Sequence, residues 1–115
     1  MREILFRGKR KDNGEWVYGN YAVTDNNEKQ HFIFQNKAFE FEVVPETVGQ
    51  YTGLTDKNGK KIFEGDIVKY INSLPCKIGY IDSQFVMMWK NSYRNFERVY
   101  DDEIEIIGNI HDNPN

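Results

Sequence analysis

No disulfide bond can form within this chain, because Cys76 is its only cysteine. That usage fits a reducing compartment, and we expect Cys76 to be an ordinary, partly buried thiol. The two histidines, His31 and His111, stand apart from each other and from Cys76. Zinc sites need Cys and His in clusters of characteristic spacing. The sequence therefore predicts no metal site built from these residues.

Long apolar runs are also lacking. No segment approaches the roughly 18 consecutive apolar residues of a membrane-spanning helix. The first residues, MREILFRGKRK, contain no apolar core of a signal peptide. Charged residues make up 29% of the chain, which indicates a well-solvated surface. We therefore expect a soluble cytoplasmic protein with no membrane partner.

The motifs of common catalytic and cofactor sites are missing as well. Phosphate-binding glycine patterns are absent, and no serine stands in a nucleophile motif. The segment DKNGKKIFEGD does not follow the ligand order of a calcium loop, because Gly59 comes too early after Asp56. The sequence predicts a protein that is not an enzyme and needs no cofactor or metal. One carboxylate cluster is interpreted as a solvated strand edge that repels unwanted pairing: Asp101, Asp102, Glu103 and Glu105.

What the chain does contain is a series of short β-favouring runs separated by turn residues. Phe39, Phe41 and Val43 alternate with Glu40 and Glu42, the period of a strand with one buried face. The pattern predicts an all-β barrel or sandwich of at least five strands, with helix confined to short turns. The strands are expected at residues 4–9, 15–23, 31–35, 38–44, 47–54, 60–71 with a bend at 65–66, 76–82, 85–90 and 103–110.

Glycine is concentrated at the centre of the chain. Residues 48–70 hold four of the nine glycines, and Asn58 and Gly59 form the tip of an expected turn. Gly53, Gly59 and Gly65 are expected at positive φ or at a close backbone approach. A similar Asn-Gly pair at residues 13–14 predicts the first hairpin. We interpret the central segment as a device of the fold.

The C-terminal half supplies most of the expected core. Residues 91–102 are left open between a helical turn, a strand and a loop, because Tyr93, Phe96 and Val99 fall at helical spacing in a stretch too short to decide. The core candidates come from both faces of the expected strands: Val68, Tyr70, Ile78, Ile81, Val86, Trp89, Ile104 and Ile106.

Three segments resemble the YopX family, small and largely uncharacterised proteins of phages and prophages of Gram-positive bacteria. They are VPETVGQYTGLTDKNGKKIFEGDIV at the centre, FRGKRKDNGEWVYGN near the start and IEIIGNIHDNP near the end. The resemblance implies one mostly β domain over residues 1–115. Its N-terminal hairpin region covers about residues 1–45, and a small SH3-like barrel covers about 46–112. The resemblance implies no activity.

The first expected hairpin carries the one functional lead. Arg7, Lys9 and Lys11 alternate on its first strand, while Trp16 and Tyr18 alternate on its second. Cations beside aromatic rings are typical of surfaces that stack single-stranded bases and of hot spots in protein interfaces. The alternative is structural: the rings belong to the core, and the cations form the opposite, wet face.

Charge is unevenly distributed between the two ends of the chain. Residues 1–11 carry a side-chain balance of +4 and residues 97–112 one of −5, although the net charge is −3. Such asymmetry marks either a partner surface or ordinary solvated faces. We expect a phage or prophage binding or regulatory protein that contacts a host or phage protein. The alternatives are a module for single-stranded nucleic acid, a partner class that is not favoured, and a homo-oligomeric assembly protein.

Overall fold

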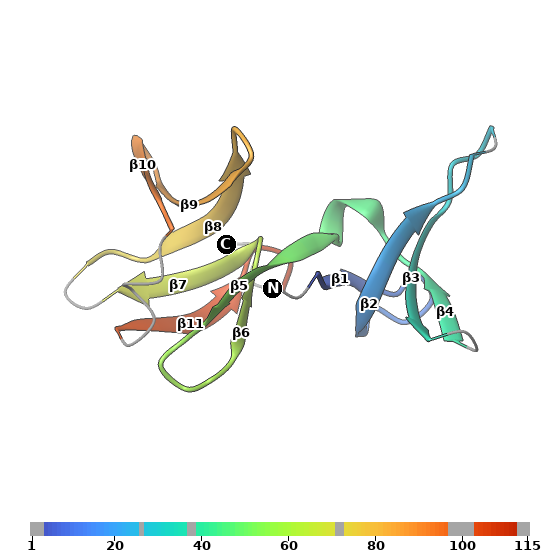
Figure 1. The fold of residues 1–115 in the computed structure, drawn as a ribbon, viewed down its shortest axis with the longest axis horizontal. Coiled ribbons are helices and arrows are strands. Elements are labelled where there is room, and N and C mark those ends of the chain that lie inside the picture. Colours follow the sequence, from blue (N-terminus) through green and yellow to red (C-terminus); the bar gives the residue numbers. More distant parts are fainter. Residues whose placement is uncertain (1–3, 26, 37–38, 71–72, 97–102, 113–115) are drawn as a thin grey trace. The chain divides into compact units, whose positions relative to one another are not determined.

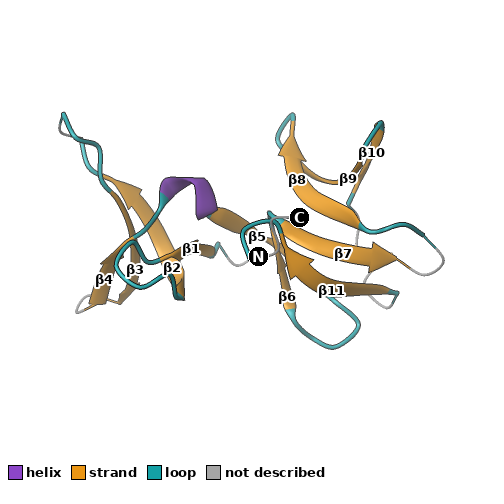
Figure 2. Cartoon of the chain, turned by 180° about the vertical axis from the view of Figure 1, so that it is seen from behind, coloured by secondary structure: helices purple, strands orange, loops and turns teal. Residues whose placement is uncertain are grey.

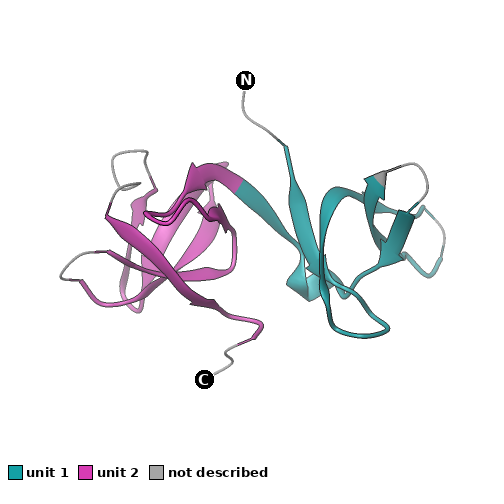
Figure 3. Cartoon of the chain, turned by 90° about the horizontal axis from the view of Figure 1, so that it is seen from below, with its two compact units in different colours: residues 1–51 teal, residues 52–115 magenta. Residues whose placement is uncertain are grey.

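The computed structural model of this protein describes residues 4–25, 27–36, 39–70, 73–96 and 103–112. These residues form eleven strands and one short 3-10 turn, and they contain no α-helix (Figures 1 and 2). The predicted all-β class, with helix confined to a short turn, is confirmed. The chain divides into two compact units, residues 1–51 (unit 1) and residues 52–115 (unit 2) (Figure 3).

Unit 1 is an antiparallel sheet in the order β4-β3-β2-β1-β5. At its far end β4 returns toward β1, because Val44 N donates a 2.9 Å hydrogen bond to Lys9 O and Lys11 N donates another to Glu42 O. The strand β5 begins in this unit and ends in unit 2. The elements are β1 Phe6–Lys9, β2 Trp16–Val23, β3 His31–Asn36, β4 Phe39–Glu42, the 3-10 turn Pro45–Thr47 and β5 Gly49–Thr55.

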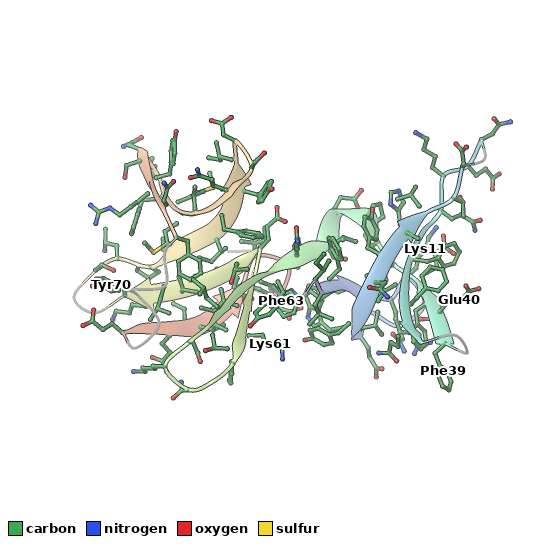
Figure 4. The ribbon with its side chains drawn as sticks, viewed as in Figure 1. Lys11, Phe39, Glu40, Lys61, Phe63 and Tyr70 are labelled. Atoms are coloured by element: carbon green, nitrogen blue, oxygen red, sulfur yellow. The ribbon has the colours of Figure 1, made fainter. Side chains whose placement is uncertain are left out.

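The core of unit 1 lies on one face of this sheet. Val17, Ile33 and Val43 are buried there, and Phe41 packs against them as its alternation with glutamate predicted. Phe39 was expected on the same buried face, and that expectation is wrong. The side chain of Phe39 is 55% exposed and extends away from the unit (Figure 4). Phe39 is the first residue of β4, which ends the strand order, and the β3–β4 register shifts just beside it, between Phe34 and Asn36. No further strand of this sheet covers the side chain of Phe39 among the described residues.

Unit 2 contains a five-stranded antiparallel sheet in the order β10-β9-β8-β7-β11, together with β6, which pairs with β5. The order ends at β10 on one side and at β11 on the other, so the sheet is open. The SH3-like barrel implied for this region is therefore not confirmed. The strands are β6 Lys61–Phe63, β7 Asp66–Tyr70, β8 Cys76–Ile81, β9 Gln84–Trp89, β10 Ser92–Asn95 and β11 Ile104–Asn109.

The glycine-rich centre of the chain forms the turns of unit 2, as predicted. Gly53, Gly59 and Gly65 have φ of +90°, +82° and +95°, which glycine adopts without steric cost. The buried carboxylate of Asp56 accepts hydrogen bonds from Asn58 N and Lys60 N at 2.8 and 3.0 Å. Its second oxygen accepts a bond of 3.1 Å from the backbone N–H of Ile106 in β11. The turn is thereby tied to a strand some fifty residues away in the chain.

The core of unit 2 differs in part from the predicted one. Val68, Ile78, Val86 and Ile104 are buried as expected. Tyr70, Ile81, Trp89 and Ile106 are only partly buried, although Trp89 and Ile106 pack against the core. In β9 three consecutive residues are buried, so a period of two could not select among them. The core residues that the sequence analysis missed are Ile62, Cys76, Phe85, Met87 and Phe96.

Two turns near β9 were not resolved by pattern alone. Asp82 and Ser83 form the two-residue turn between β8 and β9, with φ of +51° and +64°. Neither is a glycine, so this turn carried no strong sequence signal. The open segment 91–102 begins with strand β10, which pairs with β9. The alternative of a helical turn that reaches Val99 and Tyr100 lies outside the described residues. The same is true of Asp101 and Asp102, which were expected at a solvated strand edge.

Candidate partner-binding surface

The first hairpin brings four of the five predicted site residues onto one face. In the β1–β2 register Arg7 lies opposite Tyr18, and Lys9 lies opposite Trp16. Directly opposite residues of an antiparallel pair point to the same side of the sheet. Arg7, Lys9, Trp16 and Tyr18 therefore share one face, which we call the hairpin surface.

Trp16 is the centre of the hairpin surface. The guanidinium carbon of Arg7 lies 4.5 Å from the centre of the indole ring, and Lys9 Nζ lies 5.5 Å from it. Both distances fall within the roughly 6 Å of a cation–π interaction. Arg7 is only 6% exposed, whereas Tyr18 is 44% exposed. The rings and cations thus form a fixed cluster with a tyrosine at its outer side.

The opposite face of the same hairpin belongs to the core of unit 1. Val17 is buried there, and Phe6 packs against the cluster of Val17, Ile33 and Val43. The structural alternative placed the rings in the core and the cations on the other face. That alternative is wrong, because the register and the cation–π contacts put Trp16 and the two cations on the same side.

Residues of β3 and β4 extend this face, which the sequence analysis did not recognise. Phe34 lies opposite Asn20 of β2, and Phe32 lies opposite Ala22, so both rings point to the side of the hairpin surface. Their ring centres are 6.2 Å apart. Glu40 and Glu42 follow on β4, opposite Phe34 and Phe32. The alternation in HFIFQ and FEFE was the signal for this face.

Lys11 does not join the hairpin surface. It follows the end of β1, where its backbone N–H donates to Glu42 O. Its Nζ lies 3.4 Å from Glu42 Oε2 in an exposed ion pair. Lys11 therefore contributes to the β4 side of unit 1 and not to the cluster around Trp16.

Arg10 forms a second cation–aromatic contact that the sequence analysis missed. Its guanidinium carbon lies 4.5 Å from the ring centre of Phe41, and two of its nitrogens donate to Asp12 at 3.0 and 2.7 Å. The hydrogen bond from Arg10 keeps the pKa of the Asp12 carboxyl below its ordinary value. A depression of about 480 Å³ lies here, but its two cations are paired with Asp12 and Glu42. The depression is therefore poorly suited to an anion.

The candidates for metal and nucleophilic chemistry are occupied with structural roles where the structure describes them. Glu105 makes an ion pair of 3.7 Å with Lys57. Burial raises the pKa of the Cys76 thiol to about 11, so it stays protonated at neutral pH, in line with the expected ordinary thiol. His31 lies 2.6 Å from the hydroxyl of Tyr21. Within the described ranges, no three of the residues His, Cys, Asp and Glu group as a metal site would require.

Two comparisons with known proteins gave matches. Residues 5–115 match the YopX protein family. The chain is also similar to the crystal structure of protein EF1440 from Enterococcus faecalis, with a TM-score of 0.62 and 24% identity over 99% of this chain and 97% of that one. That likeness shows a shared fold. The curated proteins include no match. None of the helical residues described is part of a segment long and apolar enough to cross a membrane.

Proposed function

The chain belongs to the YopX protein family, and from this premise we propose that it is a small phage or prophage binding protein that regulates a host or phage protein through direct contact. The hairpin surface is the proposed contact. No catalytic step, metal or cofactor is assigned to the protein, and its proposed location is the bacterial cytoplasm. The observation that carries the proposal is the cluster of Arg7, Lys9 and Trp16 with Tyr18 beside it.

The residue types of the hairpin surface and the restricted mobility of its side chains both support a protein partner. Tryptophan, tyrosine and arginine are the residues that most often dominate binding energy in protein interfaces. Trp16 is held in place by the side chains of Arg7 and Lys9, so little conformational freedom remains to be lost on binding. Tyr18 presents a large exposed ring next to this rigid group. Such an arrangement suits an apolar partner surface that carries hydrogen-bond acceptors.

Single-stranded nucleic acid fits the same surface less well. Base stacking needs an open aromatic face, and the guanidinium of Arg7 already lies over the ring of Trp16. Glu40 and Glu42 lie on the same side of the sheet, where they would repel phosphates. Charge of both signs around an aromatic centre favours a protein over a polyanion.

The proposal is tested by capture with a matched pair of variants. The tagged protein is expressed in a bacterium that carries a prophage encoding it, and captured proteins are identified by mass spectrometry. Lys9→Glu combined with Tyr18→Ala should reduce recovery of the partner by roughly tenfold or more, the scale of a hot-spot loss. Tyr93→Ala removes a ring that is 57% exposed in unit 2 and should leave recovery unchanged.

A second measurement separates the two partner classes. Binding of fluorescent oligo(dT) is followed by anisotropy at low and high salt. Salt-sensitive binding that disappears with Tyr18→Ala would assign the hairpin surface to nucleic acid and overturn the proposal. Equal recovery of every captured protein by the double variant and the wild type would overturn it as well.

A further inference from the structure

Unit 2 carries an apolar groove beside its core, and Cys76 belongs to both. The groove has a volume of about 470 Å³ and is broadly open to solvent. Leu74, just before β8, and Ile110, just after β11, contribute to its walls. Leu74 is 76% exposed and Ile110 is 38% exposed. Two separate segments of the chain thus place exposed apolar side chains around one depression.

The strands of unit 2 hold the groove in shape. Trp89, the last residue of β9, donates a hydrogen bond of 3.1 Å from Nε1 to Leu74 O, which ties Leu74 to β9. Met88 also lines the groove and lies opposite Lys77 in the β8–β9 register. The walls belong to paired strands and to Leu74 and Ile110, which are hydrogen-bonded to the rest of unit 2, so the groove does not need to be formed by its occupant.

The charge of the groove has one sign. Lys77 and Lys90 line it, and no carboxylate does so among the residues that the structure describes. Both lysines are exposed, and neither makes an ion pair with another described residue. The whole chain has 18 acidic and 15 basic side chains, so a groove with cations alone departs from its overall composition. Complementary charge across an interface selects the partner and orients it.

We propose that this groove binds a short peptide segment of a partner protein in which apolar side chains are flanked by carboxylates. The apolar side chains enter between Leu74, Trp89 and Ile110. The carboxylates reach Lys77 and Lys90 at the rim. This site lies in unit 2 and shares no residue with the hairpin surface, so it does not depend on the function proposed above.

Three blocked, fluorescein-labelled peptides test the proposal on the full-length protein by anisotropy. The probe is DELLDE, and its matched controls are DESSDE, which lacks the apolar residues, and KKLLKK, which reverses the charge. DELLDE should bind saturably, and both controls should bind at least about tenfold more weakly, since each loses one of the two sources of affinity. Leu74→Ser should weaken DELLDE to the level of DESSDE.

A charge swap distinguishes recognition from loss of folding. Lys77→Glu together with Lys90→Glu should weaken DELLDE by roughly tenfold and strengthen KKLLKK by a similar factor. A misfolded protein would lose both peptides. Lys29→Glu makes the same kind of change on an exposed residue of unit 1 and should leave both affinities unchanged.

Several results would overturn the proposal. They are equal affinity for DELLDE and DESSDE, equal affinity for DELLDE and KKLLKK, and the absence of saturable binding of DELLDE. Self-association of the wild type that disappears in the double lysine variant would assign the groove to a second copy of the chain, and would overturn the peptide assignment too.

Discussion

Units 1 and 2 place their aromatic side chains differently. In unit 2, Phe85 and Phe96 are part of the buried core, and Trp89 packs against it. In unit 1, Trp16 and Tyr18 lie on the face away from the core, next to Arg7 and Lys9. Burial of a ring stabilises a fold, whereas a ring held on an outer face provides surface for recognition. The contrast holds for these rings and not for every aromatic residue, since Phe41 packs against the core of unit 1 and Tyr93 of unit 2 is 57% exposed.

The two cores also differ in size. Among the described residues, eight buried side chains form one cluster in unit 2, and three form the cluster in unit 1. Regions with few buried apolar contacts open locally at lower free energy than well-packed regions. Unit 1 should therefore be the less stable part of the chain, and substitutions should separate the two units.

The largest expected effect comes from removing a buried isoleucine in each unit. Ile104 in unit 2 and Ile33 in unit 1 are both 0% exposed. Ile104→Ala should lower the free energy of unfolding by about 3–4 kcal/mol, and Ile33→Ala by about 2–3 kcal/mol, because a smaller core collapses more easily onto the cavity. Urea denaturation measures both. An equal or larger loss for Ile33→Ala would end the claim that unit 2 has the stronger core.

Two glycines in strands provide a second pair. A Cβ added at Gly19 in β2 would overlap the backbone carbonyl of Phe34, whereas one added at Gly79 in β8 would meet the sulfur of Met88. A carbonyl in a paired strand cannot move aside, but the end of an unbranched side chain can. Gly19→Ala should cost about 3 kcal/mol and Gly79→Ala less than about 1.5 kcal/mol. Thermal unfolding of both variants gives the ranking, and a reversed order would contradict the geometry at Gly19.

These pairs also show how far the sequence could lead. The period of two and the turn residues predicted most of the strands, but β10 fell in the segment that was left open, and Gly53, Gly59 and Gly65 were expected at positive φ or at a close backbone approach. They could not identify the residues buried in β9, because a strand covered on both faces has no alternation. The same-face clustering around Trp16 required the register, which pattern alone does not give. The alternation of β3 puts Phe32 and Phe34 on one face. It does not show that β3 pairs with β2, which is what makes these two rings extend the hairpin surface.

Asp56 offers a test that changes with pH. Burial opposes ionisation of its carboxyl, but hydrogen bonds from the backbone N–H groups of Ile106, Lys60 and Asn58 outweigh that cost and lower its pKa. A lowered pKa in the folded state stabilises the fold above the unfolded pKa of about 3.9, and this stabilisation is lost as the pH falls through the folded pKa.

Replacing this carboxylate should therefore cost more at neutral pH than at acidic pH. Asp56→Ala leaves buried backbone donors without their acceptor and should lower the free energy of unfolding by about 2 kcal/mol at pH 7. Asp56→Asn keeps one acceptor oxygen and should cost less. Urea titrations from pH 7 to about pH 3 measure the gap between wild type and Asp56→Asn. A gap that stays constant down to the lowest pH would show that the carboxylate is not needed in its charged form.

The smallest expected effect concerns association between copies of the chain. The opposite charges of residues 1–11 and 97–112 suggested a homo-oligomer, and the described residues already pair part of that charge. Arg10 binds Asp12, Lys11 binds Glu42 and Glu105 binds Lys57, each within its own unit. Exposed charges that are paired locally contribute less to an interface between molecules.

We therefore propose only weak, salt-dependent self-association. The strand β10 stands at the end of its strand order, and a second copy can cover such an edge. Sedimentation velocity at high protein concentration should show a fraction of dimer at low salt that disappears at high salt, because the screening length falls to about 3 Å at about 1 M salt. A monomer under both conditions would contradict the proposal and would leave the hairpin surface, with its exposed Tyr18, as a contact for a different protein.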